Sequence, residues 1–169
     1  MILDYDFFNR DVLEVAPDLV GKILVHRTEK GEVRERIAET EAYRGEEDTA
    51  CHASKGRTQR TEVMYHDSGT IYVYLCYGMH WLMNIVTGGE GNPQAVLIRA
   101  GEEYNGPAKL TKRLGVDKAF NDVSIVGNGE IWIEDDGYRP KIKTDKRVGI
   151  DYATEEYRNK EWRFIKGGD

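Results

Sequence analysis

One stretch constrains the fold of this chain more than any other: residues 36–43, which read RIAETEAY. Apolar and polar side chains alternate with a period of two, which predicts a β-strand whose one face carries Ile37, Glu39, Glu41 and Tyr43. A carboxylate is costly to bury unless it is paired or has a chemical role. By itself the stretch is typical of a half-exposed strand with its glutamates in water, and only the rest of the chain favours a functional role for Glu41.

Length and composition indicate an ordinary globular protein. The chain has 169 residues, of which 40% are hydrophobic and 32% are charged, so we expect one domain spanning residues 1–169 with a substantial core. The longest apolar run, residues 71–86, is interrupted by polar residues and glycine, which argues against a transmembrane helix there. The first residues lack the pattern of a signal peptide, so we expect a cytoplasmic protein that is not secreted, with Cys51 and Cys76 as reduced thiols.

Turn and capping signals divide the chain into many short strands and a few short helices. Asn9 is a candidate cap for a helix over residues 10–16, which Pro17 would end. Two more helices are predicted, one from Pro107 to Leu114 and a short one that Thr154 caps. The predicted strands cover residues 22–27, 33–43, 70–75, 81–87, 95–100, 131–134, 146–150 and 162–166. This pattern predicts an α+β fold, a single domain built on a curved, mostly antiparallel sheet.

Two connections are unusual for a compact domain. Residues 45–63 form a long polar loop, and loops of this length are usually functional. The connection between the strands 70–75 and 81–87 contains Tyr77, Gly78 and Met79, so large apolar side chains lie where a β-hairpin turn is normally polar. Such a protruding tip either inserts into a partner or folds back on the core, and the sequence leaves both open.

The charge distribution leaves nucleic-acid binding open. The net charge of −6 argues against a general nucleic-acid binder. The basic residues nevertheless cluster in three segments, 55–60, 109–113 and 139–147. If these segments converge in space, the protein presents a positive face, whereas each cluster alone is typical of a solvated surface.

Common catalytic motifs are missing. The sequence contains no His-Glu-x-x-His, Cys-x-x-Cys, Gly-x-Ser-x-Gly or Gly-x-Gly-x-x-Gly, and its four histidines are scattered. No lysine or N-terminal proline stands out as a Schiff-base nucleophile. We therefore expect no metal site, and the remaining candidate chemistry is a carboxylate that acts on water.

Several motifs, in order along nearly the whole chain, resemble those of the alkyladenine-type 3-methyladenine DNA glycosylases, the methylpurine DNA glycosylase family. They are ETEAY at 39–43, residues 48–52, GTIYVY at 69–74, YGM at 77–79, MN at 83–84, LIRA at 97–100, GPAKL at 106–110, RVG at 147–149 and WRF at 162–164. The resemblance implies a monofunctional enzyme that hydrolyses the N-glycosidic bond of damaged purines in duplex DNA, with no lyase activity and no cofactor. Its implied partner is double-stranded DNA with 3-methyladenine or 7-methylguanine, hypoxanthine being an open case, and a monomer is the simplest assembly.

The resemblance also implies roles for individual residues. Glu41 is the general base that positions the attacking water, and Arg99 and Val148 help to hold that water, Val148 through its carbonyl. Asn84 opposes the 2-amino group of normal guanine at the floor of a base pocket whose aromatic walls are Tyr43, His52 and Tyr74. Tyr77 wedges into the minor groove in place of the extruded nucleotide.

Elementary chemistry agrees with these roles. A base inside a duplex is out of reach, so it must be flipped out at a cost of a few kcal/mol, which an inserted Tyr77 or Met79 offsets. Stacking on aromatic rings contributes about 1–3 kcal/mol per base. Arg99 favours the ionised form of Glu41, which must be charged to activate water. Contacts with the DNA backbone are assigned to basic residues, so affinity should fall with salt; these are Lys55, Arg57, Arg60 and Lys109.

Other interpretations stay open. Glu39 and Tyr72 are assigned to structure, Glu39 with a basic partner and Tyr72 in packing. The main alternative function is a non-catalytic lesion-binding or nucleic-acid-binding module of the same fold, and a third is a hydrolase of free nucleosides or small glycosides. Two departures from the family bear on footprint and lesion range: only residues 101–105 stand where a longer, largely helical insert is usual, and Thr61 stands where asparagine is common.

Overall fold

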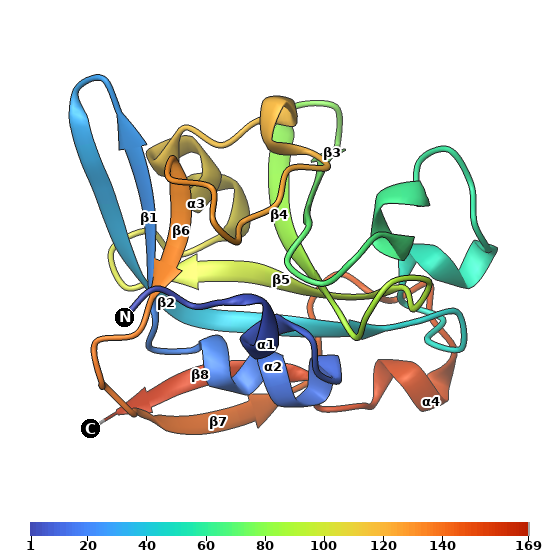
Figure 1. Cartoon of the computed structure of the whole chain (residues 1–169). Coiled ribbons are helices and arrows are strands. Elements are labelled where there is room, and N and C mark those ends of the chain that lie inside the picture. The colour runs from blue at the N-terminus through green and yellow to red at the C-terminus, as the bar shows by residue number, and fades with distance from the viewer. Residues whose placement is uncertain (169) are drawn as a thin grey trace.

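The computed structural model describes residues 1–168, and short helices surround one sheet (Figure 1). The helices are α1 (Tyr5–Phe8), α2 (Val12–Leu19), α3 (Pro107–Leu114) and α4 (Glu155–Arg158), joined by the 3₁₀-helices η1 (His52–Lys55), η2 (Glu62–Tyr65) and η3 (Lys118–Phe120). The strands are β1 (Ile23–Thr28), β2 (Gly31–Arg44), β3 (Ile71–Cys76), β4 (His80–Thr87), β5 (Gln94–Gly101), β6 (Ile131–Glu134), β7 (Lys141–Asp145) and β8 (Arg163–Gly168).

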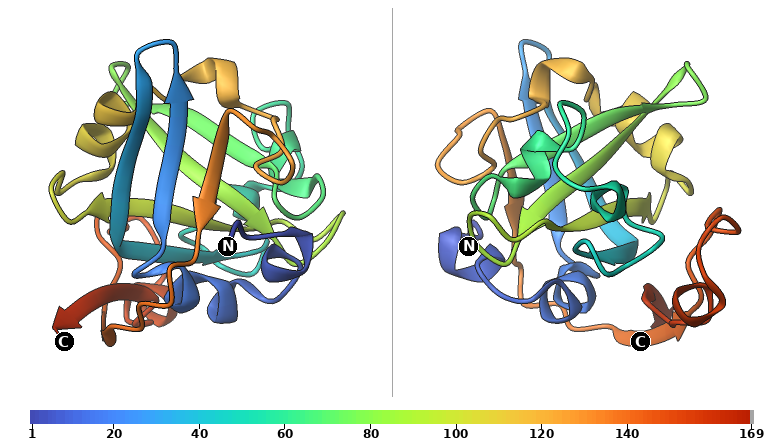
Figure 2. Two further views of the ribbon diagram at one scale, coloured as in Figure 1. Left: turned by 60° about the vertical axis from the view of Figure 1, so that its left-hand side comes forward. Right: turned by 90° about the vertical axis from the view of Figure 1, so that its right-hand side faces the viewer.

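The strands form a single sheet that stays open in the described part of the chain. The strand order is β3-β4-β5-β2-β1-β6, and β8 pairs with both β2 and β7. All of these pairings are antiparallel. The two views in Figure 2 show the curvature of the sheet. The predicted α+β class with a curved, mostly antiparallel sheet is therefore confirmed.

The long strand β2 connects the two parts of this sheet. It pairs with β1 from Gly31 to Arg36 and with β5 from Ile37 to Arg44. The register with β5 shifts on both sides of Glu39, which indicates a β-bulge there. A bulge bends the strand and changes the direction of the side chains that follow it. Figure 1 shows the resulting turn of β2 from the β1 side toward β5 and β8.

The bulge corrects the predicted face of Ile37. Strict alternation placed Ile37 beside Glu39 and Glu41, but its side chain is buried in the main core together with Ala42. The hydroxyl of Thr40, on the same face as Ala42, donates to the Ala16 carbonyl at 2.7 Å. One extra residue at the bulge reverses the alternation, so Ile37 joins the core while Glu41 faces the other side of the sheet.

The main hydrophobic core lies between the sheet and the helices α2 and α3. α2 begins after Asp11, whose carboxylate accepts a hydrogen bond from the Leu13 amide at 2.9 Å, and not after Asn9 as predicted. It also continues through Pro17 to Leu19. Leu19 is fully buried, and this burial offsets the hydrogen bond that a proline removes from a helix.

Most other predicted elements lie within one or two residues of their observed bounds, and α3 and β6 match residue by residue. The prediction of a strand at residues 146–150 is wrong. The strand in this region is β7, which ends at Asp145, and residues 146–150 form a loop. Arg147 turns inward there to pair with the buried Asp48, which is incompatible with continued strand pairing. The sequence analysis also did not predict α1.

Among residues 1–168, none of the helices has the length and apolar character needed to span a lipid bilayer.

Candidate active site

Glu41 lies in the second half of β2 and has no exposed surface. Its Oε1 accepts a hydrogen bond from the Tyr43 hydroxyl at 2.8 Å, and its Oε2 accepts one from the Val148 backbone N–H at 2.7 Å. Arg99 Nε is 3.7 Å from the same Oε2. Burial raises the pKa of Glu41 above its ordinary value, and the Val148 amide, Arg99 and the Tyr43 hydroxyl oppose that rise. Arg99 thus acts in the predicted direction, but desolvation outweighs it.

Arg99, on β5, lies between two carboxylates. Its Nε is 3.0 Å from Glu39 Oε2, and Arg163 Nη1 of β8 is 3.3 Å from the other oxygen of Glu39. The basic partner predicted for Glu39 is therefore confirmed, and there are two. Because Glu39 holds Arg99, the guanidinium is fixed beside Glu41. Val148 contacts Glu41 through its N–H, while the water-binding role of its carbonyl stays a prediction.

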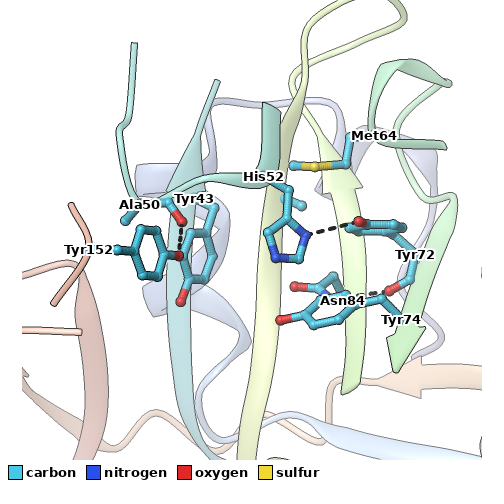
Figure 3. A pocket seen from close by; sticks show the side chains of 9 residues that line it. Tyr43, Ala50, His52, Met64, Tyr72, Tyr74, Asn84 and Tyr152 are labelled. Atoms are coloured by element: carbon cyan, nitrogen blue, oxygen red, sulfur yellow. Dashed lines mark hydrogen bonds between the residues drawn. The ribbon is translucent and has the colours of Figure 1, made fainter. Parts of the chain in front are cut away.

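A pocket lined mainly by aromatic side chains lies next to Tyr43 (Figure 3). It contains about 320 Å³ of empty space including its mouth. The structure brings together all four residues predicted for a base pocket, and the complete lining is Tyr43, Ala50, His52, Met64, Tyr72, Tyr74, Asn84, Ala95 and Tyr152. Figure 3 shows the Tyr43 ring on one side and the His52 ring on the other. A flat aromatic ligand can stack between two such surfaces.

Two tyrosines of β3 hold His52 at the start of η1. The His52 Nδ1 is 3.0 Å from the Tyr72 hydroxyl, and its ring centroid is 4.6 Å from that of Tyr74. Burial, assisted by the charges of Arg60 and Lys55, lowers the pKa of His52 to about 4, so the ring is neutral at pH 7. A neutral ring does not repel a cationic purine. Tyr72, assigned from sequence to packing alone, also lines the pocket and orients His52.

Asn84 and Tyr152 lie at different depths in this pocket. Asn84, on β4, is buried, and its side-chain amide donates to the Tyr72 carbonyl at 3.2 Å. Tyr152 is 67% exposed, and its hydroxyl donates to the Ala50 carbonyl at 2.6 Å. Sequence reasoning missed Tyr152, Ala50 and Met64. The only available signal was the position of Tyr152 shortly after the RVG motif, since nothing local brings residue 152 to residue 50.

The β3–β4 hairpin carries Tyr77 and Met79 away from the body of the protein (Figure 2). Tyr77 is 90% exposed and Met79 is 71% exposed. Tyr77 and Gly78 both have positive φ, 53° and 70°, which is typical of tight hairpin turns. The tip therefore does not fold back on the core, which decides between the two alternatives that the sequence left open. Insertion of these side chains into DNA stays a prediction.

An outer cleft connects Glu41 and Arg99 with Tyr77 of the hairpin tip. Pro107 and Ala108, at the start of α3, line this cleft, and the exposed Lys109 follows them. A carboxylate, a cation and an exposed aromatic ring thus share one concave surface.

A second groove beside the pocket contains two of the predicted DNA-backbone residues, Lys55 and Arg60. Arg57 does not join them, because its guanidinium pairs with Glu62 at 2.7 Å and lies over the Tyr65 ring. Thr61 is buried under the groove, and its hydroxyl donates to the Gly56 carbonyl at 2.9 Å. The loop is therefore organised by short-range hydrogen bonds that the sequence did not reveal.

Arg147 corrects the prediction of a basic surface cluster over residues 139–147. Its side chain has no exposed surface, and its Nη1 is 2.6 Å from Asp48 Oδ2. Asp48 compensates the charge of this buried guanidinium, and the terminal nitrogens bond to Asp48 and to the carbonyls of Ala42 and Tyr157, whereas the buried Nε has no hydrogen-bond partner in the described part of the chain. In the described part of the chain, no group of three or more His, Cys, Asp or Glu side chains is placed to hold a metal ion.

Comparisons with known proteins show the family to which this chain belongs. A family model described as Methylpurine-DNA glycosylase (MPG) matches residues 6–105 and 103–169. The chain therefore belongs to the methylpurine-DNA glycosylase family. The two matched segments meet within the connector between β5 and α3, where the sequence analysis found a short segment in place of an insert.

Bacterial relatives match along almost their whole length. The protein of Natranaerobius thermophilus is 44% identical over 97% of this chain and 94% of its own. That of Borreliella afzelii is 44% identical, with coverage of 99% and 97%, and that of Desulfitobacterium hafniense is 45% identical, with coverage of 96% and 93%. Each of the three has the name "Putative 3-methyladenine DNA glycosylase".

Proposed function

We propose that this protein is a monofunctional DNA glycosylase that removes alkylated purines, such as 3-methyladenine and 7-methylguanine, from duplex DNA. One observation carries the proposal. Glu41 is a fully buried carboxylate, aimed by the Val148 amide and the Tyr43 hydroxyl, beside an aromatic pocket. The family and the names of the relatives support the same reaction class.

In this mechanism ionised Glu41 accepts a proton from the water that attacks C1′ of the damaged nucleotide. The bond between C1′ and the purine nitrogen breaks, and the base leaves with the bonding electrons. An alkylated purine is cationic and becomes neutral on leaving, so it needs little acid catalysis. Neutral hypoxanthine needs a proton donor, which makes it the harder substrate. Arg99 favours the ionised form of Glu41 before the water transfers its proton to it.

The pocket and the hairpin supply access to the base. Tyr43 and His52 stack on the flipped purine, and Asn84 discriminates against the 2-amino group of normal guanine. Tyr77 and Met79 occupy the space that the base leaves in the duplex. Phosphates are bound by Lys55, Arg60 and Lys109, and by Arg57 once it exchanges Glu62 for DNA. We expect a cytoplasmic monomer to carry out the reaction.

The proposal is tested by single-turnover cleavage of duplexes that contain one 7-methylguanine or one hypoxanthine, followed by alkali to reveal abasic sites. Wild type should release the base with a chelator present, and Glu41→Gln should be slower by roughly 10²–10⁴-fold. Glu35→Gln is a matched control, because Glu35 is a buried carboxylate on the same strand that bonds to the Glu103 amide. Tight binding without release by wild type would indicate the lesion-binding module instead.

The hairpin tip can be tested separately. Tyr77→Ala should slow excision from a duplex more than excision from a single strand, since only the duplex leaves a gap to be filled. Tyr5→Ala is the control, because Tyr5 is an exposed tyrosine on α1 whose hydroxyl bonds to Asp67. Equal losses on both substrates would exclude the wedge.

A further inference from the structure

The ion pair between Asp48 and Arg147 has no exposed surface on either side chain. The two terminal nitrogens of the guanidinium each meet one carboxylate oxygen, at 2.6 and 2.9 Å. Bidentate pairs of this kind fix orientation as well as charge. Desolvation offsets most of their Coulomb energy, so a buried pair by itself is weak evidence for stability. The residues in contact with the Asp48–Arg147 pair indicate a further role for it.

The guanidinium of Arg147 lies against two aromatic rings. Its Cζ is 5.0 Å from the ring centroid of Tyr43 and 5.0 Å from that of Trp162. The same group donates to the carbonyls of Ala42 and Tyr157, at 3.0 and 3.2 Å. The pocket wall Tyr43 is therefore packed against a cation that hydrogen bonds and an ion pair hold in place.

Asp48 fixes the loop segment that lines the pocket beside Tyr43 (Figure 3). Its carboxylate accepts hydrogen bonds from the amides of Arg44 and Ala50, at 3.0 and 3.1 Å. Ala50 lines the pocket, and its carbonyl accepts the hydroxyl of Tyr152. His52 follows two residues later in the same loop. The pair thus connects the end of β2 with the loop that carries His52.

The pair is also connected to Glu41 through the chain itself. Arg147 immediately precedes Val148, whose N–H aims the carboxylate of Glu41. On the basis of the function proposed above, we propose that Asp48 and Arg147 are positioning residues of the reaction. They hold the stacking wall Tyr43 and set the amide that orients Glu41. Neither side chain reaches the substrate, since both are buried beneath the pocket.

This proposal is tested with a double variant, Asp48→Asn with Arg147→Met, which removes both charges and leaves no unpaired ion. The single-turnover rate should fall roughly 10–100-fold, the loss expected from a small displacement of reacting groups. The affinity for undamaged duplex should stay the same. Thermal unfolding shows whether the fold is retained, and Arg34→Met is the control, because Arg34 on β2 pairs with Glu134 away from the pocket.

A second measurement follows Glu41 directly, by NMR titration of ¹³C-labelled glutamate in the free protein. In the double variant the pKa of Glu41 should rise, because the Val148 amide is less well held and the cation of Arg147 is lost. Arg147→Lys is titrated beside it, because lysine keeps the cation but cannot pair bidentately, so a raised pKa there reports the position of the amide. A purely structural pair would leave the titration of Arg147→Lys unchanged. The other titratable or charged groups near Glu41 are Glu39, Tyr43, Tyr74, Arg99, Arg147 and Tyr152.

If the double variant does not fold, Arg147→Lys decides, because lysine keeps the cation but cannot pair bidentately. A lower rate with a raised Glu41 pKa supports the proposal. A folded variant with the wild-type rate and the wild-type titration overturns it. If wild type releases no base, the proposed function fails, but the titration of Glu41 still tests the positioning of its carboxylate.

Discussion

Two carboxylates at the site are fully buried and lie seven residues apart in the sequence, yet their surroundings differ. Asp48 accepts hydrogen bonds from two guanidinium nitrogens of Arg147 and from the backbone amides of Arg44 and Ala50. Glu41 accepts hydrogen bonds from one backbone amide and one hydroxyl, and Nε of the cation beside it, Arg99, is 3.7 Å from its Oε2.

This difference separates a structural carboxylate from a reactive one. An ionised carboxylate has about four acceptor positions. The four donors around Asp48 occupy such positions, so accepting a proton would break bonds that hold the pocket together. Glu41 has acceptor capacity left for a water molecule, and burial has raised its pKa. Incomplete satisfaction, rather than burial alone, is what suits Glu41 to the role of general base that we propose for it.

The largest effect is expected on the stability of the fold when the structural carboxylate, Asp48, is removed. Asp48→Ala leaves Arg147 buried without its partner, which should lower the free energy of unfolding by about 3–5 kcal/mol. Urea denaturation measures this loss. Asp18→Ala is the control, because Asp18 pairs with Arg10 at the surface and should cost less than about 1 kcal/mol. Similar small losses in both variants would show that Asp48 is not a structural carboxylate.

A smaller effect of opposite sign is expected at Glu41. Since its pKa in the folded protein is raised, the ionised carboxylate costs folding free energy above that pKa, and the cost disappears as the pH falls and the group is protonated. Glu41→Gln removes this cost, so Tm at pH 7 should be higher than that of wild type. Below pH 4.5 the two proteins should melt together. A lower Tm of Glu41→Gln at pH 7 would show that Glu41, like Asp48, is a structural carboxylate.

The smallest effect is expected when one hydrogen-bond donor to Glu41, the Tyr43 hydroxyl, is removed. Tyr43→Phe keeps the ring but removes a hydrogen bond from Glu41, which should raise the pKa of Glu41 further. The acidic limb of the cleavage-rate profile should therefore move to higher pH, while the rate on the plateau above it stays close to that of wild type. A pH–rate profile under single-turnover conditions measures the shift. An unmoved acidic limb would show that the hydroxyl does not tune the carboxylate.

Local sequence patterns determined much of this protein. The proline and glycine at the ends of α3 and the alternation in the strands were sufficient to predict these elements, and the apolar residues between β3 and β4 indicated a hairpin tip whose exposure only the structure decided. The motifs carrying the family resemblance also identified residues that the structure brings together at one site, from Glu41 and Arg99 to the pocket walls. The helix, the strands and the turns depend on neighbours a few residues away, so periodicity and turn chemistry reveal them, whereas the pocket residues came from the family resemblance.

Other features were decided only by the tertiary structure. The bulge near Glu39 moved Ile37 into the core, Arg147 turned inward to a carboxylate 99 positions earlier, and Arg57 was taken up by Glu62. Tyr152 became part of the pocket through a hydrogen bond to Ala50. Whether a charge is buried depends on the free energy of desolvation and on the partner that compensates it. That partner is set by the path of the whole chain, which local sequence patterns do not specify.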